Sequence, residues 1–152
     1  MRAIDDPITF TVLTEIRMIE QLVNARLQRA LPAGLELSQF AVLNQLSSTG
    51  GEKSPAQLAR AFQLTKGAMT NTVKRLEARG LIRVADDPGD GRRKLLAVTE
   101  AGRALRDEAV AALTPVFAEI AEGVGRDALR AMLPGLRVLR THMTADRGSP
   151  AG

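Results

Sequence analysis

The chain lacks cysteine and carries a single histidine, His142. Without cysteine, a disulfide framework and a thiol redox switch are excluded, and one imidazole leaves no cluster of metal ligands. The same shortage removes the usual nucleophile and base pairs of an enzyme. The adjacent carboxylates, Asp86 with Asp87 and Asp107 with Glu108, fit a turn and a helix surface. We therefore expect no catalytic centre, no cofactor and no metal site.

Aromatic residues are also scarce, with four Phe and no Trp or Tyr among 152 residues. The core must therefore be filled by aliphatic side chains and Met, and few rings are present to stack on the bases of a single-stranded nucleic acid. No apolar run approaches the ~20 residues that span a bilayer. Residues 1–6 do not resemble a secretory signal. These absences predict a cytoplasmic protein with no membrane partner.

Positive charge is concentrated in one part of the chain. The formal net charge is +4, but residues 60–106 hold 11 Lys and Arg against 5 Asp and Glu, a net of +6. The remaining residues hold 10 against 12, a net of −2. A local excess neutralises phosphates, whereas evenly spread charge would only improve solubility. Residues 60–106 are therefore a candidate nucleic-acid-binding segment.

The start of this segment has the pattern of a helix-turn-helix. Ser54 and Gln57 have the spacing of a capping box that opens a short helix. A turn over residues 63–64 then leads to Thr65, the cap of a second helix over residues 65–79. Two helices joined so closely are typical of a helix-turn-helix.

The second helix has two different faces. Met69, Val73 and Leu76 recur at helical spacing and are expected in the core. The opposite face is small, polar and basic, which suits a major groove, because amide and cationic side chains can pair with base edges or phosphates. An ordinary solvated surface could have the same composition, so this helix alone does not decide the question. The candidate DNA contacts on the helix are Lys66, Thr70, Asn71, Lys74 and Arg75.

A β-hairpin is predicted directly after this helix. Strands are expected over residues 81–85 and 95–99, joined by a charged loop that turns at Pro88 and Gly89. A hairpin in this place forms the wing of a winged helix-turn-helix, here over residues 81–99.

The predicted loop carries the cations that would meet DNA. Arg92 is best placed to enter a minor groove, and Arg93 and Lys94 lie beside it. Asp90 is two residues away, on the same side of an extended strand, and we expect its carboxylate to hold the guanidinium of Arg92. A solvated loop with an incidental ion pair is the alternative.

Four stretches together have the pattern of one known family. They are Leu37–Phe40 with Leu43 and Leu46, Ser54–Ala59 followed by Thr65–Gly80, Gly80–Ile82, and Asp90–Arg92 with Thr99–Gly102. On these motifs the chain resembles the MarR (multiple antibiotic resistance regulator) family of winged helix-turn-helix regulators, over residues 8–143. The last stretch is the most specific, although Val98 stands where the family more often has Leu.

The resemblance implies a homodimeric regulator of transcription, and we expect a repressor. It implies that Arg92 is the minor-groove residue of the wing, that Asp90 orients it, and that residues 65–79 form the recognition helix. It also implies a small, often aromatic or phenolic, anionic effector, bound where a helical scaffold meets the winged domain. Nothing in the composition identifies that effector.

The two ends of the chain are predicted to form a helical dimerisation region, from residues 7–31 and 100–143. Pro115 is expected to kink or divide the second of these segments. Their apolar stripes exceed what the winged domain of residues 37–99 can cover, so we expect a homodimer. A two-fold axis then presents two recognition helices to a pseudo-palindromic operator, with half-sites about 10 base pairs apart.

Two smaller segments complete the expected fold, which is mainly α-helical with a small β-hairpin wing. Ser38 is expected to cap a helix over residues 39–47, followed by a polar loop with a short edge strand. Residues 145–152 are expected to be a disordered tail.

The function predicted from these elements is sequence-specific binding of double-stranded DNA by a transcriptional regulator. A winged domain that binds only other proteins is the alternative, and it would have no need for cations in the wing. An enzyme fits the sequence less well than either.

Overall fold

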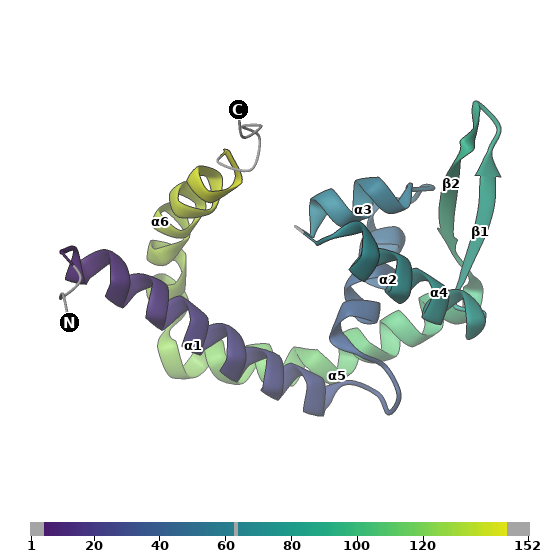
Figure 1. Cartoon of the computed structure of the whole chain (residues 1–152). Coiled ribbons are helices and arrows are strands. Elements are labelled where there is room, and N and C mark those ends of the chain that lie inside the picture. Colours follow the sequence, from purple (N-terminus) through teal and green to yellow (C-terminus); the bar gives the residue numbers. More distant parts are fainter. Residues whose placement is uncertain (1–4, 63, 146–152) are drawn as a thin grey trace, which may run out of the picture. The chain divides into compact units, whose positions relative to one another are not determined.

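The computed structural model describes residues 5–62 and 64–145. In chain order they form α1 (Pro7–Ala30), α2 (Leu37–Thr49), α3 (Pro55–Ala61), α4 (Lys66–Ala78), β1 (Ile82–Asp87), β2 (Asp90–Val98), α5 (Glu100–Val124) and α6 (Arg126–Ala145) (Figure 1). Helices dominate, and β1 and β2 form one antiparallel hairpin, which confirms the predicted fold class. No helix of the described ranges is both long and apolar enough to cross a membrane.

The chain divides into two compact units. The N-terminal unit runs to Leu113 and the C-terminal unit begins at Thr114, so α5 contributes residues to both. The predicted regions 7–31, 37–99 and 100–143 do not coincide with this division, and their roles remain predictions.

The core of the N-terminal unit lies where α2, α3 and α4 meet the hairpin. Met69, Val73 and Leu76 on α4 are buried there, as predicted from their spacing. Fully buried leucines from the neighbouring elements complete the core: Leu35, Leu43, Leu46, Leu58 and Leu96. At an upper estimate of about 2 kcal/mol for each buried large aliphatic side chain, this cluster is a main source of the unit's stability.

The helix-turn-helix begins at the predicted caps. The backbone N–H of Ser54 donates to Oε1 of Gln57 at 2.8 Å, and the N–H of Gln57 donates to the Ser54 hydroxyl at 3.2 Å. Thr65 accepts from the N–H of Ala68 at 3.2 Å and so caps α4. These contacts confirm the predicted capping box of α3 and the predicted cap of α4. Gln63, half of the predicted turn, lies outside the described residues.

The start of α2 differs from the prediction. Glu36, and not Ser38, is the N-cap, because the Glu36 N–H donates to Oε1 of Gln39 at 3.1 Å. Ser38 therefore lies inside the first turn and the predicted cap was wrong. The signal that could have placed this end correctly is Gln39, which has the right spacing from Glu36 for a capping box.

The hairpin is longer than predicted, since much of the expected charged loop belongs to strands. Ile82 pairs with Val98, and the register is regular up to Asp86 opposite Lys94. An irregularity follows, after which Asp87 pairs with Asp90. Asp86 of β1 lies opposite Lys94 of β2 and forms an ion pair with it, and a cross-strand pair of opposite charges favours pairing over an open loop. In Figure 1 the hairpin extends beyond α4 as a wing.

Two further contacts complete the sheet. Lys53 makes an isolated antiparallel bridge with Leu96, which confirms the short edge strand expected before α3. After β2, the Thr99 hydroxyl accepts from the N–H of Gly102 at 3.1 Å and donates to the carbonyl of Gly80 at 2.7 Å. The same residue therefore caps α5 and joins it to the end of α4.

Pro115 does not divide α5, so the alternative in which this proline breaks the helix in two was wrong. The helix includes Pro115 and continues to Val124, and α6 likewise includes Pro134. A proline removes one backbone hydrogen bond from the helix interior, and the surrounding turns retain theirs. Ala145, the first residue of the predicted tail, belongs to α6, and the rest of that predicted segment, residues 146–152, lies outside the described ranges.

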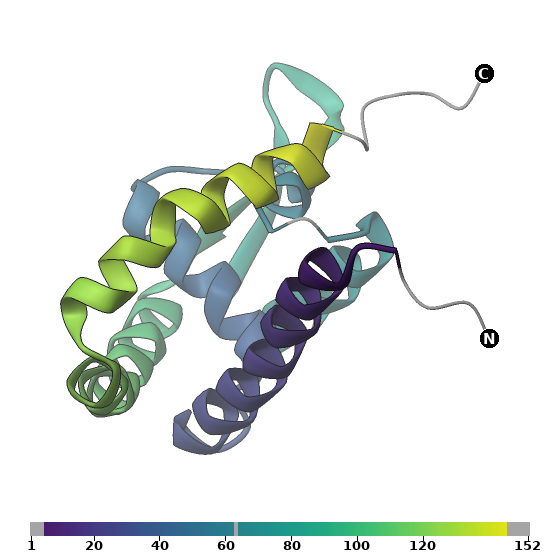
Figure 2. The same ribbon diagram turned by 90° about the vertical axis from the view of Figure 1, so that its left-hand side faces the viewer.

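Both terminal helices expose large apolar side chains. On α1, Ile8 is 69% exposed and Leu22 is 67% exposed, while Leu27 near the end of the helix is buried. Figure 2 shows α1 in purple beside α2, which it contacts. On α6, Leu136 and Val138 are exposed and no residue is buried. These faces are those expected of a scaffold that packs against another surface.

Candidate nucleic-acid interface

A basic cavity lies between α3, α4 and β2 in the N-terminal unit. Its volume is about 350 Å³. Four of its nine lining residues are cations and none is a carboxylate: Ser54, Pro55, Ala56, Lys66, Met69, Thr70, Arg92, Arg93 and Lys94. The arrangement therefore concentrates positive charge where the first turn of α4 faces β2.

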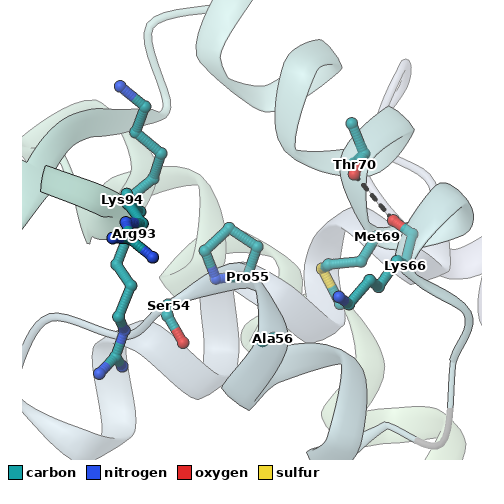
Figure 3. Close-up of a pocket in the computed structure, with 9 residues that line it drawn as sticks. Ser54, Pro55, Ala56, Lys66, Met69, Thr70, Arg93 and Lys94 are labelled. Carbon is teal, nitrogen blue, oxygen red and sulfur yellow. Dashed lines mark hydrogen bonds between the residues drawn. The ribbon is translucent and has the colours of Figure 1, made fainter. Parts of the chain in front are cut away.

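The fold fixes the two sides of this basic cavity. Figure 3 shows Arg93 and Lys94 on one side of Pro55, and Lys66 with Thr70 on the other. Met69 is buried, and the capping box of Ser54 fixes the first turn of α3. Two cationic elements thus approach one concave surface, as a rounded anionic backbone requires.

The outer face of α4 presents the predicted helix residues. Lys66, Asn71 and Lys74 are exposed, and neither lysine forms an ion pair with a carboxylate of the described ranges. The Thr70 hydroxyl donates to the Lys66 carbonyl at 2.8 Å, so its oxygen lone pairs stay available to a donor. The ammonium groups and the Asn71 amide are thus open to a ligand that approaches this face.

Arg75 is placed differently from the other predicted contacts. Its two terminal nitrogens donate to the two carboxylate oxygens of Glu36, at 2.8 Å and 2.6 Å. This hydrogen bonding lowers the pKa of the Glu36 carboxyl and raises the pKa of Arg75. The guanidinium is therefore occupied by the segment before α2 and does not line the basic cavity.

In the wing, two of the three adjacent cations have acidic partners. Lys94 forms an ion pair with Asp86, and Nε of Arg93 lies 3.9 Å from a carboxylate oxygen of Asp87. Within residues 5–62 and 64–145, Arg92 has no such partner. Among the three wing cations, the guanidinium of Arg92 is therefore the one that no carboxylate of the described residues holds.

Asp90 contacts a different part of Arg92 from the one expected. Its carboxylate accepts the backbone N–H of Arg92 at 3.0 Å, and no ion pair joins it to the guanidinium among the described residues. The reason is reach: a short Asp side chain bonds readily to the backbone two residues on, as in an Asx turn. Asp90 therefore orders the wing backbone and leaves the guanidinium to project.

Sequence reasoning missed Arg79 and Gln28, which hold the segment before α2. Nη1 of Arg79 donates to the Gly34 carbonyl at 2.7 Å, and the Gln28 amide bonds to the backbone of Leu35 and Leu37. No local signal marks the Arg79 contact, because its partner lies 45 residues earlier. The only sequence signal for the two hydrogen bonds of Gln28 is that this polar residue lies near the end of the apolar stripe of α1.

The described part of the chain holds no group of three or more His, Asp or Glu side chains that could bind a metal ion.

Comparison with known proteins agrees with this arrangement. The model of the MarR family matches residues 33–93. The transcriptional repressor NicR of Pseudomonas putida is 35% identical over 95 residues, which cover 62% of this chain. The chain matches only 57% of the length of NicR.

Solved structures extend the similarity along the chain. BpsR of Bordetella bronchiseptica has 28% identity and a TM-score of 0.77, over 86% of this chain and 98% of that one. A MarR-family regulator from Rhodococcus sp. RHA1 has 28% identity and a TM-score of 0.76, over 91% of this chain and 96% of that one. With its winged helix-turn-helix and these relatives, the chain belongs to the MarR family.

Proposed function

We propose that this protein regulates transcription by binding double-stranded DNA, with α4 in the major groove and the wing in a flanking minor groove. The observation that carries the proposal is the basic cavity, where Lys66 of α4 and three wing cations line one concave surface. Lys74 and Asn71 would contact base edges or phosphates from the exposed face of α4. Arg92 would enter the minor groove.

The same proposal includes a homodimer. The exposed apolar residues of α1 and of α6 need a partner surface, and a second copy of the chain supplies one of matching character. The winged helix-turn-helix domains of the two subunits, related by a two-fold axis, would bind half-sites about 10 base pairs apart. Occupancy of such an operator in a promoter would exclude polymerase, so we propose a repressor.

The test is selection of bound fragments from a random duplex pool, followed by titration of the selected duplex at several salt concentrations. Arg92→Ala should weaken binding strongly, and Lys66→Ala should make the plot of log K against log salt shallower by about 0.9. Lys74→Ala should cost about 1 to 3 kcal/mol at one operator position if it reads a base.

The control is Arg137→Ala, which removes the same charge from an exposed position on α6, outside the proposed interface. It should leave the affinity nearly unchanged. Binding that survives Arg92→Ala and Lys66→Ala would favour the alternative, a winged domain that binds only proteins. A selection that returns no duplex would reject DNA binding altogether.

A small aromatic or anionic effector completes the proposal. The support is the relative BpsR, whose DNA binding is regulated by 6-hydroxynicotinic acid. Adding this compound to the DNA titration tests whether a heteroaromatic acid of this type shifts the affinity. An unchanged affinity at saturating concentration would exclude it as the effector.

A further inference from the structure

The segment between α1 and α2, residues 31–36, is held by side chains from two helices. On the α1 side, the Gln28 amide donates to the Leu35 carbonyl at 2.9 Å and accepts from the Leu37 N–H at 3.0 Å. One side chain thus spans the end of this segment and the first residue of α2.

On the other side, Arg75 of α4 and its C-cap residue Arg79 contact the same segment. Arg75 makes the paired hydrogen bonds to Glu36 at 2.6 Å and 2.8 Å. Arg79 donates from Nη1 to the Gly34 carbonyl at 2.7 Å, and to Oε1 of Gln39 at 3.4 Å. We call Arg75, Arg79, Glu36 and Gly34 the arginine latch.

The arginine latch lies away from the basic face of α4. Arg75 and Arg79 are four residues apart and so share one side of the helix. That side is about 100° around the helix from Lys74, next to the buried stripe. Both carboxylate oxygens of Glu36 are engaged by one guanidinium, a pairing whose planar geometry fixes direction as well as distance.

The energetics of the Glu36–Arg75 ion pair favour a role in orienting α4 over a role in stabilising the fold. Glu36 and Arg75 are each 47% exposed, and ion pairs with this exposure add little to the free energy of unfolding. Their joint effect is to fix how α4 is rotated against the segment before α2. Contacts in a recognition surface must be held within about 0.5 Å and 10–20° to be productive.

We infer that Glu36, Arg75 and Arg79 are positioning residues, which set the orientation of the recognition helix, and that Arg75 does not itself contact DNA. The inference rests on the proposed function. It assigns Arg75 a role different from that of Lys66, Lys74 and Arg92.

The decisive variant is Glu36→Gln, because the loss of a negative charge and the loss of the contact that positions α4 predict opposite changes in the affinity for DNA. Removing a negative charge near the interface strengthens electrostatic attraction to DNA. If the latch positions α4, the variant instead weakens binding about five- to tenfold, as expected when only a tenth to a fifth of the molecules hold the competent orientation. Glu77→Gln is the matched control, since it removes the same charge from an exposed position on α4, outside the latch. It should not weaken binding.

Two further variants keep the inference falsifiable. Arg75→Gln should weaken binding with the salt slope unchanged, whereas loss of a phosphate contact would reduce the slope by about 0.9. The exchanged pair Glu36→Arg with Arg75→Glu should recover most of the affinity, because the ion pair re-forms with reversed direction. Thermal unfolding of each variant, compared with the wild type, verifies that it is folded.

The outcomes separate the two proposals. If the wild type binds the selected duplex and Glu36→Gln binds it equally or more tightly, the latch is rejected and DNA binding stands. A reduced salt slope for Arg75→Gln, or an exchanged pair that binds worse than either single variant, would likewise show direct contact by Arg75. If the wild type binds no duplex, both proposals fall together.

Discussion

Gly102 lies where the first turn of α5 meets the backbone that follows α4. A Cβ atom at this position would be 2.0 Å from the Leu81 carbonyl oxygen and 2.8 Å from Cγ2 of Val98. Only the absence of a side chain allows this approach. Gly102 is part of the sequence motif Thr99–Gly102, but only the packing shows why this position requires a glycine.

Gly102→Ala should therefore lower the free energy of unfolding by about 1 to 3 kcal/mol, the usual cost of forcing extra atoms into a packed site. Urea denaturation measures this loss. Gly123→Ala is the control within the same helix, because no atom beyond the neighbouring residues and the local helix backbone lies within 4 Å of a Cβ built there. Alanine should stabilise that position by roughly 0.5 to 1 kcal/mol. Equal effects of the two substitutions would contradict the close approach.

Residues with local signals were predicted well, and residues with distant partners were not. The buried positions Met69, Val73 and Leu76 follow from helical spacing alone. The contacts of Arg75 and Arg79 join residues 39 and 45 positions apart, so no neighbouring residue reports them. The prediction that Arg75 contacts DNA rests on its charge and its place on α4, and charge alone does not reveal a carboxylate that another part of the chain brings to it.

At the scale of elements, the helix starts depend on short-range hydrogen bonds that the sequence largely reveals. The caps at Ser54 and Thr65 agree with the prediction, whereas a capping box with Gln39 places the N-cap of α2 at Glu36 and not at the hydroxyl of Ser38. The extent of the hairpin was not predictable in the same way. Its outer part contains residues typical of loops, and the pairing of Asp86 with Lys94, which supports the strand there, is visible only once the register is known.

The capping box of α3 gives a prediction at this scale. Ser54→Ala should lower the free energy of unfolding by about 0.5 to 2 kcal/mol, since it leaves the Gln57 N–H without its acceptor. Thermal or urea unfolding would measure it. Ser38→Ala, at the position first expected to be a cap, should change stability by less than about 0.5 kcal/mol. A larger loss for Ser38→Ala than for Ser54→Ala would contradict both assignments.

At the scale of the whole molecule, the apolar faces of the terminal helices have the most direct consequence. A dimer that buries them would be stabilised by mass action, so its melting temperature should rise with protein concentration. Leu22→Glu should reduce the mass measured by light scattering to that of one chain, because Leu22 is 67% exposed on the apolar stripe of α1. The adjacent Gln21→Glu adds the same charge off that stripe and should leave the mass unchanged. A single-chain mass for the wild type would refute the homodimer.

The amide of Gln28 has a mechanical consequence for signalling. It belongs to the last turns of α1, yet it bonds to the backbone on both sides of Glu36, the residue that Arg75 engages. A shift or rotation of the end of α1 would thus be transmitted to α4 through a few short, directional hydrogen bonds. The core between the two helices would not need to repack. Under the proposed function, small movements at the end of α1 would in this way change the affinity for DNA.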